Sequence, residues 1–524
     1  MRLAYWILAC AAYAFFLFHK IDLTTADLGR HLKNGEWFLT HHKIPSTNFY
    51  SYTFPDFPAV NHHWGGGVLF FLVWKLAGFP GLTVLFAALS LAAFAFFFKV
   101  AEDEAGTGLA FVAALLVTPL LAERLEVRPE VLSYLFCGVF FWVLWAHRGR
   151  PEFSRWFWVL PALEVLWVNS HIYFFLGPLL VGIFWTGSLA EERGTAHSRS
   201  LLILLLATEA ATFATPFGLH GALAPLEVFR NYGYRIVENQ SMWTLIRVSY
   251  QHPNVYWFIF VFAALAAGFA FAIARGGKKI PPVAFVLALL FGAMGWLALR
   301  NLTIFGFFAI PLLALTFSRG LFPAGDGELS GGWVLLASAL IAGLACVGLS
   351  ASIMRATWSF GAGLLPGNLK AAKYFEYNHL AGPILNNYDI GGYLIYTLPE
   401  DERVFVDNRP EAYPASFFND VYIPMLADNA VWLREDERRR FNVIYFDHQE
   451  HAVWTKAFMA RRLQDPGWAL VYYDPQVLIL LRRTPQNEAV IQRDEIPSSR
   501  FVPPREWLEA EKIESRLAAA ASIR

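Results

Sequence analysis

Long apolar segments dominate this chain and limit what it can fold into. A transmembrane helix needs about 20 mostly apolar residues, because each residue rises about 1.5 Å through about 30 Å of hydrocarbon. Eleven segments approach this requirement, several of them short. They lie near residues 3–19, 79–98, 106–121, 131–147, 156–170, 172–190, 200–215, 255–274, 281–298, 302–318 and 332–352. The sequence therefore predicts a polytopic α-helical membrane protein with about 11 transmembrane helices.

The composition agrees with a membrane protein and excludes several other classes. Of 524 residues, 16% are charged and 56% are hydrophobic, whereas soluble domains carry about 25% charged and about 45–50% apolar residues. The 42 Lys and Arg residues balance 42 Asp and Glu residues, so nothing points to nucleic acid as a partner. The three cysteines, Cys10, Cys137 and Cys346, lie in apolar runs without metal-ligand spacing. No cofactor is predicted, and a divalent metal stays open without support from a motif.

Short basic clusters predict how the chain is oriented in the membrane. No small-x-small cleavage site follows residues 3–19 before Asp22, which favours an uncleaved first helix over a signal peptide. With a cytoplasmic N-terminus, the short basic clusters then fall on the cytoplasmic side. Those inside loops are 99–105, 148–155, 191–199, 275–280 and 319–331. The same count places the C-terminal region outside the cytoplasm.

The chain divides by hydropathy into three predicted regions. Residues 1–365 form a transmembrane domain with a large first exoplasmic loop at 20–78, residues 366–483 form a soluble α/β domain, and residues 484–524 form a polar tail with a helix at 504–520. Strands are expected at 382–386, 403–407, 442–447, 468–474 and 476–483, with helices at 368–378, 389–398, 415–439 and 450–463 between them. The last two strands flank Pro475 and predict a hairpin.

The first exoplasmic loop has helical patterns of its own. Leu28, Leu32, Trp37 and Phe38 share one face of a helix and predict an amphipathic helix at the membrane interface. A second apolar run, from Trp64 to Leu76, predicts a re-entrant or surface-lying helix.

Ionisable side chains gather on the predicted outer face, although charge is costly near a membrane. The candidates come from separate loops: Asp27, His31, His62, His63, Arg124, Arg128, His171 and Arg300. Arginines can hold a phosphate bidentately, and a carboxylate can deprotonate an attacking hydroxyl. The pattern therefore favours transfer of a sugar from a lipid phosphate in one exoplasmic cleft, a reaction that needs no nucleotide-binding fingerprint.

The motifs of the first loop add a resemblance. The loop starts with Asp27, His31 and Gly35, continues through Ile44, Pro45, Ser51 and Thr53, and ends with His62 and Trp64. This order of residues resembles an uncharacterised bacterial branch of the GT-C superfamily of membrane glycosyltransferases. The segments VRPEVLSYLF, LWVNSHIYFFLG, TPFGLHG, RNLTIFGFFAIP, NYDIGGYLIY and VFVDNRPEAY are similar to later parts of the same branch, so the resemblance extends to about residue 483.

The resemblance implies a GT-C fold, a polyprenyl-phosphate-linked sugar as donor, and Asp27 as the catalytic base. It also implies the inner membrane of a bacterium, with the C-terminal domain on the periplasmic or extracellular side. The chain departs from the branch at Gly65-Gly66-Gly67, where an acidic or bulky helix start is more usual, and at His171-Ile172, where a His-Gly pair is expected. Both departures bear on the shape of the acceptor pocket.

Each candidate residue also has a structural interpretation. Asp27 is a catalytic base or a helix cap with an ion pair; His62 and His63 contact substrate, ligate a metal or fill the interface. Arg128 holds phosphate or pairs with Glu126 or Glu130, and Arg300 holds phosphate or extends to the interface. His171 is either functional or structural. For Asp407, Arg409 and Glu411, a buried ion-pair network is favoured over acceptor recognition.

The function expected from these residues is an inverting membrane glycosyltransferase. Asp27 would be the base, Arg128 and Arg300 would hold the donor phosphate, and His31, His62, His63 and His171 would shape the site. The acceptor would be an exoplasmic glycan, lipid or protein. The alternatives are a non-catalytic GT-C-like subunit of a larger complex and a transporter, although the chain shows no inverted repeat.

Overall fold

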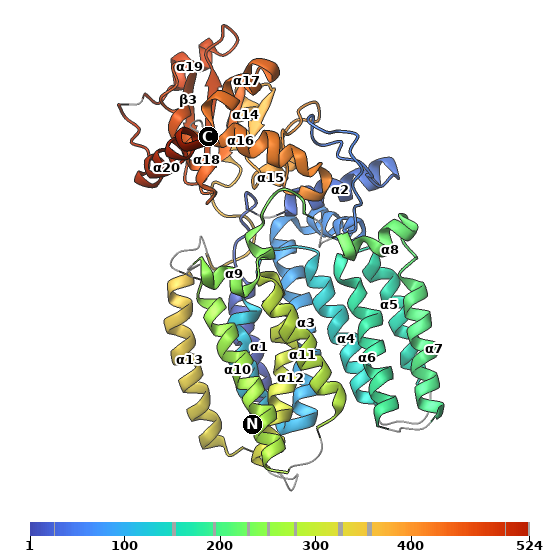
Figure 1. Ribbon diagram of the computed structural model, residues 1–524. Helices are drawn as coiled ribbons and strands as arrows, with labels where there is room; N and C mark the ends of the chain where they lie inside the picture. Colours follow the sequence, from blue (N-terminus) through green and yellow to red (C-terminus); the bar gives the residue numbers. More distant parts are fainter. Residues whose placement is uncertain are drawn as a thin grey trace. The chain divides into compact units, whose positions relative to one another are not determined.

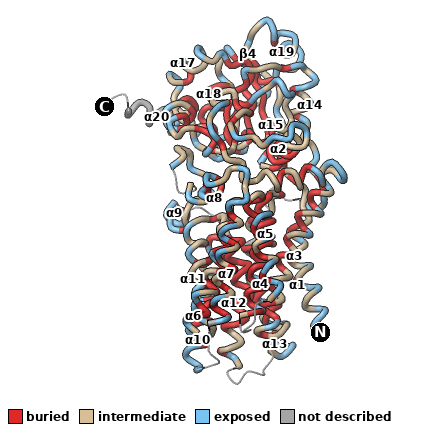
Figure 2. Tube along the Cα trace, turned by 90° about the vertical axis from the view of Figure 1, so that its right-hand side faces the viewer, coloured by how far each residue is buried: buried red, intermediate tan, exposed pale blue. Residues whose placement is uncertain are grey.

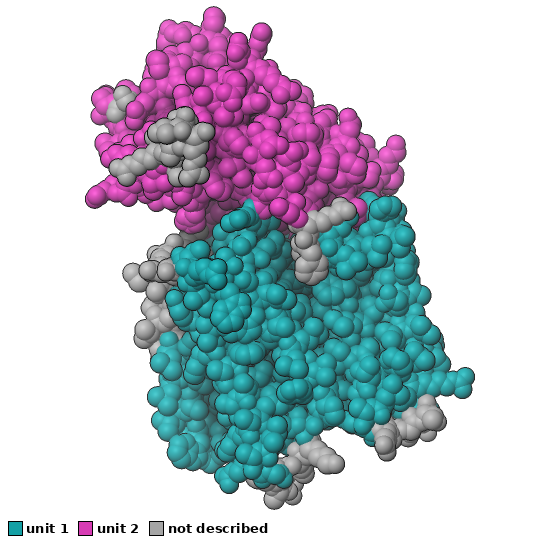
Figure 3. Space-filling model, viewed as in Figure 1, with its two compact units in different colours: residues 1–21, 72–228, 235–363 teal, residues 22–71, 229–234, 364–524 magenta. Residues whose placement is uncertain are grey.

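A computed structural model describes residues 1–25, 27–148, 154–191, 195–227, 231–248, 252–276, 280–322, 329–353, 359–497 and 499–521. The chain divides into two compact units, shown in different colours in Figure 3. Unit 1 comprises Met1–Ile21, Leu72–Val228 and Arg235–Gly363, and unit 2 comprises Asp22–Phe71, Phe229–Tyr234 and Leu364–Arg524. The sequence had assigned the first loop to the membrane domain, whereas the structure groups most of that loop with the C-terminal region.

Unit 1 consists of helices that run alongside one another (Figure 1). Its long helices occupy the segments where apolar runs were expected, and shorter helices connect them. They are α1 (Arg2–Leu17), α3 (Trp64–Leu121, from Leu72 onward), α4 (Glu130–His147), α5 (Val159–Val168), α6 (Leu176–Ala190), α7 (Thr195–Ala211), α8 (Gly218–Glu227), α9 (Met242–Arg247), α10 (Pro253–Ala274), α11 (Pro282–Leu297), α12 (Leu302–Leu321) and α13 (Gly331–Ile353), with 3₁₀ turns η1 (Arg155–Trp158), η2 (Ile172–Phe175), η3 (Val237–Asn239) and η4 (Leu299–Asn301).

Five helices in the described part of the chain are long and apolar enough to cross a membrane. They are Trp64–Leu121, Glu130–His147, Ile172–Ala190, Pro253–Ala274 and Leu299–Leu321, and shorter apolar helices include Arg2–Leu17 and Pro282–Leu297. The 58-residue α3 has non-helical backbone at Gly78 and Gly106. A straight helix of that length would measure about 87 Å, so these glycines separate it into the shorter helices that the sequence predicts. The chain is a multi-pass membrane protein.

The helix α12 lies at the centre of unit 1. Its most apolar stretch is 83% buried, and the tube in Figure 2 shows α12 and α4 among the most buried helices. Phe308 on α12 stacks on Phe291 of α11 at 3.6 Å between ring centroids and meets Phe97 of α3 and Phe141 of α4 at 4.9 and 5.1 Å. Interlocking aromatic rings therefore join α3, α4 and α11 around α12.

Unit 2 contains a small mixed sheet with strand order β1-β2-β4-β3. The strands are β1 (Ile384–Asn386), β2 (Val443–Asp447), β3 (Trp468–Tyr473) and β4 (Val477–Arg482). β1 pairs with β2 in parallel, and β4 lies antiparallel to both β2 and β3. The predicted hairpin across Pro475 is confirmed, since β3 and β4 are adjacent antiparallel strands.

The expected strand at 403–407 is wrong, because its backbone is paired elsewhere. Val404 forms an isolated parallel bridge with Ser51 of the first loop. The side chain of Asn386 accepts a hydrogen bond from the backbone N–H of Phe405 at 2.8 Å and donates one to the carbonyl of Val406 at 2.7 Å. The backbone N–H and C=O groups of this extended segment therefore bond to a polar side chain and to the first loop, and not to a neighbouring strand.

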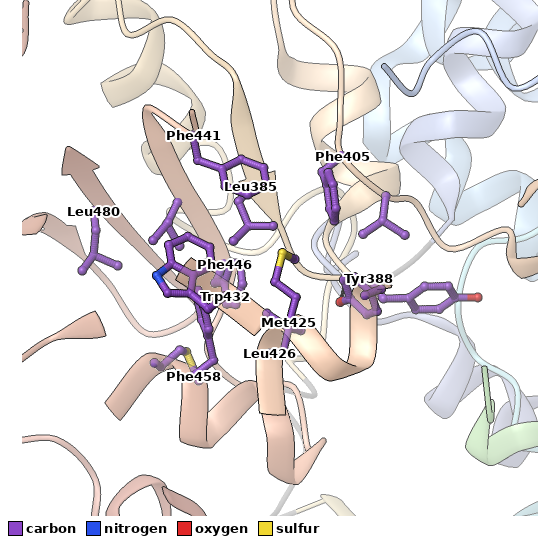
Figure 4. Packing of buried hydrophobic residues seen from close by; sticks show 14 of the residues in the cluster. Leu385, Tyr388, Phe405, Met425, Leu426, Trp432, Phe441, Phe446, Phe458 and Leu480 are labelled. Atoms are coloured by element: carbon purple, nitrogen blue, oxygen red, sulfur yellow. Dashed lines mark hydrogen bonds between the residues drawn. The ribbon is translucent and has the colours of Figure 1, made fainter. Parts of the chain in front are cut away.

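Aromatic and aliphatic side chains from several elements form the core of unit 2 (Figure 4). Trp432 stacks on Phe441 and meets Phe458 edge-on, at 5.6 and 4.9 Å between centroids. Tyr52 and Phe54 of the first loop pack against this core, which explains why the loop belongs to unit 2. The helices of unit 2 are α2 (Leu28–His41), α14 (Lys370–Tyr377), α15 (Gly391–Thr397), α16 (Ile423–Ala427), α17 (Asn429–Arg439), α18 (Val453–Arg462), α19 (Glu488–Asp494) and α20 (Arg505–Ala521), together with the N-terminal end of α3, η5 (Pro410–Ala412) and the π-helical η6 (Phe417–Tyr422).

The expected amphipathic helix of the first loop is α2, and it packs inside unit 2. A Cβ on Gly29 would lie 2.6 Å from the carbonyl oxygen of Gly392 on α15, so the two helices approach closely. Leu28 and Leu32 are buried as expected, but so are the polar Arg30, His31 and Asn34. Polar side chains thus enter the interior of the unit along this helix.

Asp447 provides a test of the interior of unit 2. It ends β2, is 2% exposed, and burial raises the pKa of its carboxyl to about 8. A carboxyl whose pKa is raised on folding loses stability as pH rises between its unfolded and folded values, by about 1.4 kcal/mol per pH unit. We expect Asp447→Asn to remove this loss. Its advantage in thermal unfolding over the parent protein should widen from pH 5 to pH 8.

The exposed Asp56 of the same unit supplies the matched control. Asp56→Asn should leave the pH profile of unfolding unchanged. An Asp447→Asn protein whose advantage is the same at pH 5 and pH 8 would contradict a neutral, buried carboxyl.

Candidate functional site

The residues singled out by the sequence fall into two groups. Arg128, His171 and Arg300 belong to unit 1. Asp27, His31, His62 and His63 belong to unit 2. The two groups thus belong to different units, and the single cleft that the sequence suggests stays a prediction.

Three arginines of unit 1 converge on the carboxylate of Glu238 in η3. Arg124 donates a hydrogen bond to Glu238, and Nη1 of Arg128 lies 3.7 Å from Glu238 Oε2. Arg300, in η4 just before α12, donates to the side-chain oxygen of the adjacent Asn239 at 3.1 Å. Its guanidinium also lies 5.9 Å from the ring centroid of Tyr173. We call Arg124, Arg128 and Arg300 the arginine cluster.

The arginine cluster controls the charge state of Glu238. Burial alone would raise the pKa of this carboxyl, but Arg124, followed by Arg128 and Arg300, outweighs burial and holds the pKa well below its usual range. Glu238 is therefore ionised throughout the physiological pH range.

Arg124 also anchors the start of α4. Its Nη2 lies 2.8 Å from Glu130 Oε2, and both side chains are less than one-tenth exposed. The hydroxyl of Tyr134, one turn further along α4, donates to the other oxygen of Glu130 at 2.9 Å. Burial would lower the pKa of Arg124, but Glu130 and Glu238 raise it well above the ordinary value. Arg124 thus acts as a fixed part of the fold.

The arginine cluster offers a hydrogen-bond donor to a bound anion. The guanidinium groups lie beside Glu130 and Glu238, and the carboxylate of Glu126 also acts electrostatically on Arg124. The Nε of Arg300 is buried and makes no hydrogen bond to another described residue. An oxyanion such as phosphate would accept a hydrogen bond from this donor.

His171 contacts α4, whose first residue, Glu130, pairs with Arg124 of the arginine cluster. It caps η2, where its side chain accepts from the N–H of Tyr173. Its Nδ1 lies 2.8 Å from Ser133 Oγ on α4, and Trp167 donates to the same hydroxyl at 2.7 Å. His171 is 3% exposed, so its position indicates a residue that orients α4 beside Glu130.

In unit 2, Asp27 occupies the N-cap position of α2 without capping it. Its side chain makes no hydrogen bond to the first turn of the helix. It accepts instead from the side-chain amide of Asn408, and it lies 3.4 Å from Nη2 of Arg30. The Nε of Arg30 is buried without a hydrogen bond to another described residue. The side chain of Asp27 is 22% exposed, which keeps this carboxylate accessible.

A buried ion pair fixes the segment that holds Asn408. Arg409 pairs with Asp407 at 2.7 Å and donates to Asn48 of the first loop at 2.6 Å. Burial would raise the pKa of Asp407, but Arg409 outweighs it and lowers that pKa. The structural ion pair favoured by the sequence is therefore confirmed for Asp407 and Arg409.

The three candidate histidines of unit 2, His31, His62 and His63, lie near one another. The ring centroids of His31 and His63 are 5.1 Å apart, and those of His62 and His63 are 6.0 Å apart. Burial lowers the pKa of His62 to about 4, so this imidazole is neutral at pH 7. Among the described residues, no group of three or more His, Cys, Asp and Glu side chains is arranged to hold a metal ion.

Gly67, the last residue of the glycine run, has a structural reason. A Cβ on Gly67 would lie 2.8 Å from the carbonyl oxygen of His31, and one on Gly35 would lie 2.3 Å from the carbonyl oxygen of Gly67. These contacts need glycine where α2 meets the N-terminal end of α3. Gly35 and Gly67 thus allow the two helices to approach closely.

Comparison with models of protein families finds no match, and neither does comparison with curated proteins. Solved structures do match. The apo oligosaccharyltransferase of Archaeoglobus fulgidus aligns with a TM-score of 0.60 at 12% identity, over 92% of this chain and 74% of that one. The same organism's AglB, in complex with an inhibitory peptide and a dolichol-phosphate, gives 0.57 at 12% identity, over 90% and 73%.

The mycobacterial arabinofuranosyltransferase AftD aligns with a TM-score of 0.51 at 14% identity, over 91% of this chain and 41% of that one. At such low identity these matches show the fold alone. The chain has a GT-C-like fold.

Arg124 and Arg128, which both lie near Glu238, differ in what their removal should cost. Arg124→Met leaves Glu130 in a buried site without its cation, which should lower the free energy of unfolding by about 3–5 kcal/mol. Arg128→Met removes a longer pair with Glu238, at 3.7 Å, and should cost less than Arg124→Met. Denaturant or thermal unfolding of the purified protein measures both. Equal losses would contradict the fixed role of Arg124.

Proposed function

We propose that this chain is a membrane glycosyltransferase that moves a sugar from a polyprenyl-phosphate carrier to an exoplasmic acceptor. The observation that carries the proposal is the arginine cluster with the buried, unsatisfied Nε of Arg300, in a chain with a GT-C-like fold. The AglB structure that holds a dolichol-phosphate supports a donor of this chemical class. The proposed setting is a bacterial inner membrane, with the N-terminus in the cytoplasm and unit 2 on the periplasmic or extracellular side.

In the proposed reaction, the donor phosphate is held by Arg128 and Arg300. Binding displaces the carboxylate of Glu238, which the arginines hold while no phosphate is present. Asp27 takes the proton from an acceptor hydroxyl as the oxygen attacks the anomeric carbon. The bond between that carbon and the phosphate oxygen breaks, and the polyprenyl phosphate leaves with the electron pair. Attack opposite the leaving group inverts the anomeric configuration.

The histidines have supporting roles in this proposal. His31, His62 and His63 shape the acceptor side, where a neutral His62 can both donate and accept a hydrogen bond from a hydroxyl group. His171 keeps Ser133 and the start of α4 in place beside the arginine cluster. A divalent metal is not part of the proposed mechanism.

Donor binding is tested with farnesyl phosphate, a short soluble analogue, by calorimetry on the detergent-solubilised protein. Arg128→Ala and Arg300→Ala should each weaken binding by about tenfold or more, because each removes a charge-assisted hydrogen bond. Glu238→Gln should tighten binding, since the competing carboxylate is lost. Because the pKa of Glu238 lies well below its usual range, this carboxylate stays ionised and competes with the phosphate from pH 5 to pH 8, so affinity should be gained at both ends of that range.

The exposed Arg247 at the end of α9 supplies the matched control, and Arg247→Ala should bind like the parent. Farnesol, which lacks the phosphate, should bind weakly and equally to all variants. Unchanged affinity in both cluster variants, or weaker binding by Glu238→Gln, would reject the arginine cluster as the phosphate site.

Catalysis is tested at Asp27. Asp27→Asn keeps the size of the side chain and its contact with Asn408 but cannot accept a proton. It should bind farnesyl phosphate as the parent does, yet lose sugar transfer from a polyprenyl-phosphate sugar by about a hundredfold or more. Thermal unfolding provides the control for folding. Full transfer by Asp27→Asn would remove the assignment of this carboxylate as base.

The alternative is a non-catalytic GT-C-like subunit of a larger complex. It is favoured by one observation: the carboxylate of Asp27 already contacts Asn408 and Arg30, as a structural ion pair would. A stoichiometric protein partner on purification, together with no binding of farnesyl phosphate, would support this alternative.

A further inference from the structure

A pocket in unit 2 is not used by the proposed donor chemistry. It measures about 440 Å³ and lies between the second half of α2, the residues that follow it at 49–50, and the end of α15 with the turn at 398–404. Ligand pockets commonly measure about 300–1,000 Å³. All of its lining residues belong to unit 2.

The wall of the pocket is aromatic. Trp37 stacks on His41 at 3.9 Å and meets Phe49 at 4.7 Å between ring centroids, and Phe49 in turn lies 4.0 Å from Tyr50. The hydroxyl of Tyr50 donates to Asn34 at 3.0 Å, which fixes this ring from behind. Ile395 and Leu398 continue the apolar surface. The packing holds the aromatic wall in place before any ligand arrives.

The rim of the pocket is charged with both signs. Lys33 pairs with Glu36 at 2.9 Å and lies 3.9 Å from Glu400, whose side chain is 94% exposed. Glu402 and Arg403 complete the rim. Three carboxylates and two cations therefore surround an apolar wall.

This combination discriminates among ligand classes. An anionic ligand would meet three carboxylates, and a lipid chain would have to cross a rim of charges without satisfying them. A sugar ring matches both parts, since its C–H faces pack on aromatic rings while its hydroxyls both donate to carboxylates and accept from Lys and Arg.

We infer that this pocket, formed by α2 and the turn after α15, binds an uncharged saccharide that forms part of the acceptor. The inference rests on the proposed glycosyl transfer, because it assigns the acceptor to the carbohydrates. Trp37 and Phe49 contact the faces of the sugar, and Glu36, Glu400 and Arg403 hold its hydroxyls. The pocket recognises the acceptor and takes no part in the chemistry.

Saturation-transfer NMR on the detergent-solubilised full chain tests the inference, with maltotetraose, cellotetraose and chitotetraose as probes at millimolar concentration. At least one probe should receive saturation from the protein. Trp37→Ala should weaken its binding by about tenfold, and Trp37→Phe should restore most of it. Trp333→Ala, at an exposed tryptophan of α13, is the matched control and should change nothing.

Two variants at the rim guard against loss of folding. Arg403→Ala and Glu400→Gln change exposed side chains at the rim and should each weaken saccharide binding several-fold while thermal unfolding stays the same. The inference is overturned if none of the three probes binds, or if the variants bind as the parent does. It is equally overturned if Trp37→Ala impairs only binding to phosphatidylglycerol vesicles, because α2 would then be a membrane anchor.

Farnesyl phosphate binding, measured on the same preparation, separates this inference from the proposed function. Donor binding that depends on Arg128, without saccharide binding, would reject the acceptor pocket alone. Saccharide binding that depends on Trp37, without donor binding, would reject the glycosyltransferase proposal and leave a carbohydrate-binding site.

Discussion

Charge in an apolar environment must be paired, and unit 1 meets this constraint around one residue. Arg124 is 7% exposed and contacts both Glu130 at the start of α4 and Glu238 in η3. The pairing joins segments that are far apart in the chain, and it places Arg128 and Arg300 beside the same carboxylate. Arg124 balances Glu130, and in the proposed reaction a phosphate replaces Glu238 as the partner of the other two arginines.

The first loop and the C-terminal region form one folded unit, and this affects the proposed base. Ser51 and Thr53 both donate to the carbonyl of Phe405, and Tyr52 and Phe54 cover the aromatic core. Asn408, from the same C-terminal segment, contacts the carboxylate of Asp27. The C-terminal region therefore sets the environment of a residue that lies more than 300 positions earlier in the chain.

Local sequence patterns predict the local structure of this protein, but they do not predict which residues far apart in the chain will contact each other. Apolar length located the long helices of unit 1, and Gly78 and Gly106 separate α3 where three apolar runs were expected. The segment 403–407 has the composition of a strand, but its partners are Asn386 and the first loop, which no local pattern reveals. The pairing of Arg124 with Glu238 spans 114 positions. The neighbours of Arg128 in the chain suggested only Glu126 and Glu130 as its partners, so Glu238 was missed.

The sequence grouped some of the candidate residues that the structure brings together. Arg128 precedes α4 and Arg300 precedes α12. A cation at such a position in a membrane protein needs a partner, which explains why both arginines lie near the carboxylate of Glu238. The pocket beside Trp37 was not foreseen, because one wall comes from α2 and the other from the turn after α15. An amphipathic pattern indicates a buried face but does not identify what covers it.

A cryo-electron-microscopy structure of the full chain with a polyprenyl-phosphate sugar tests the central claim most directly. We expect the phosphate within hydrogen-bond distance of the guanidinium groups of Arg128 and Arg300, with the carboxylate of Glu238 displaced from them. A phosphate bound elsewhere, with Glu238 still in contact with the arginine cluster, would refute the assignment of these arginines.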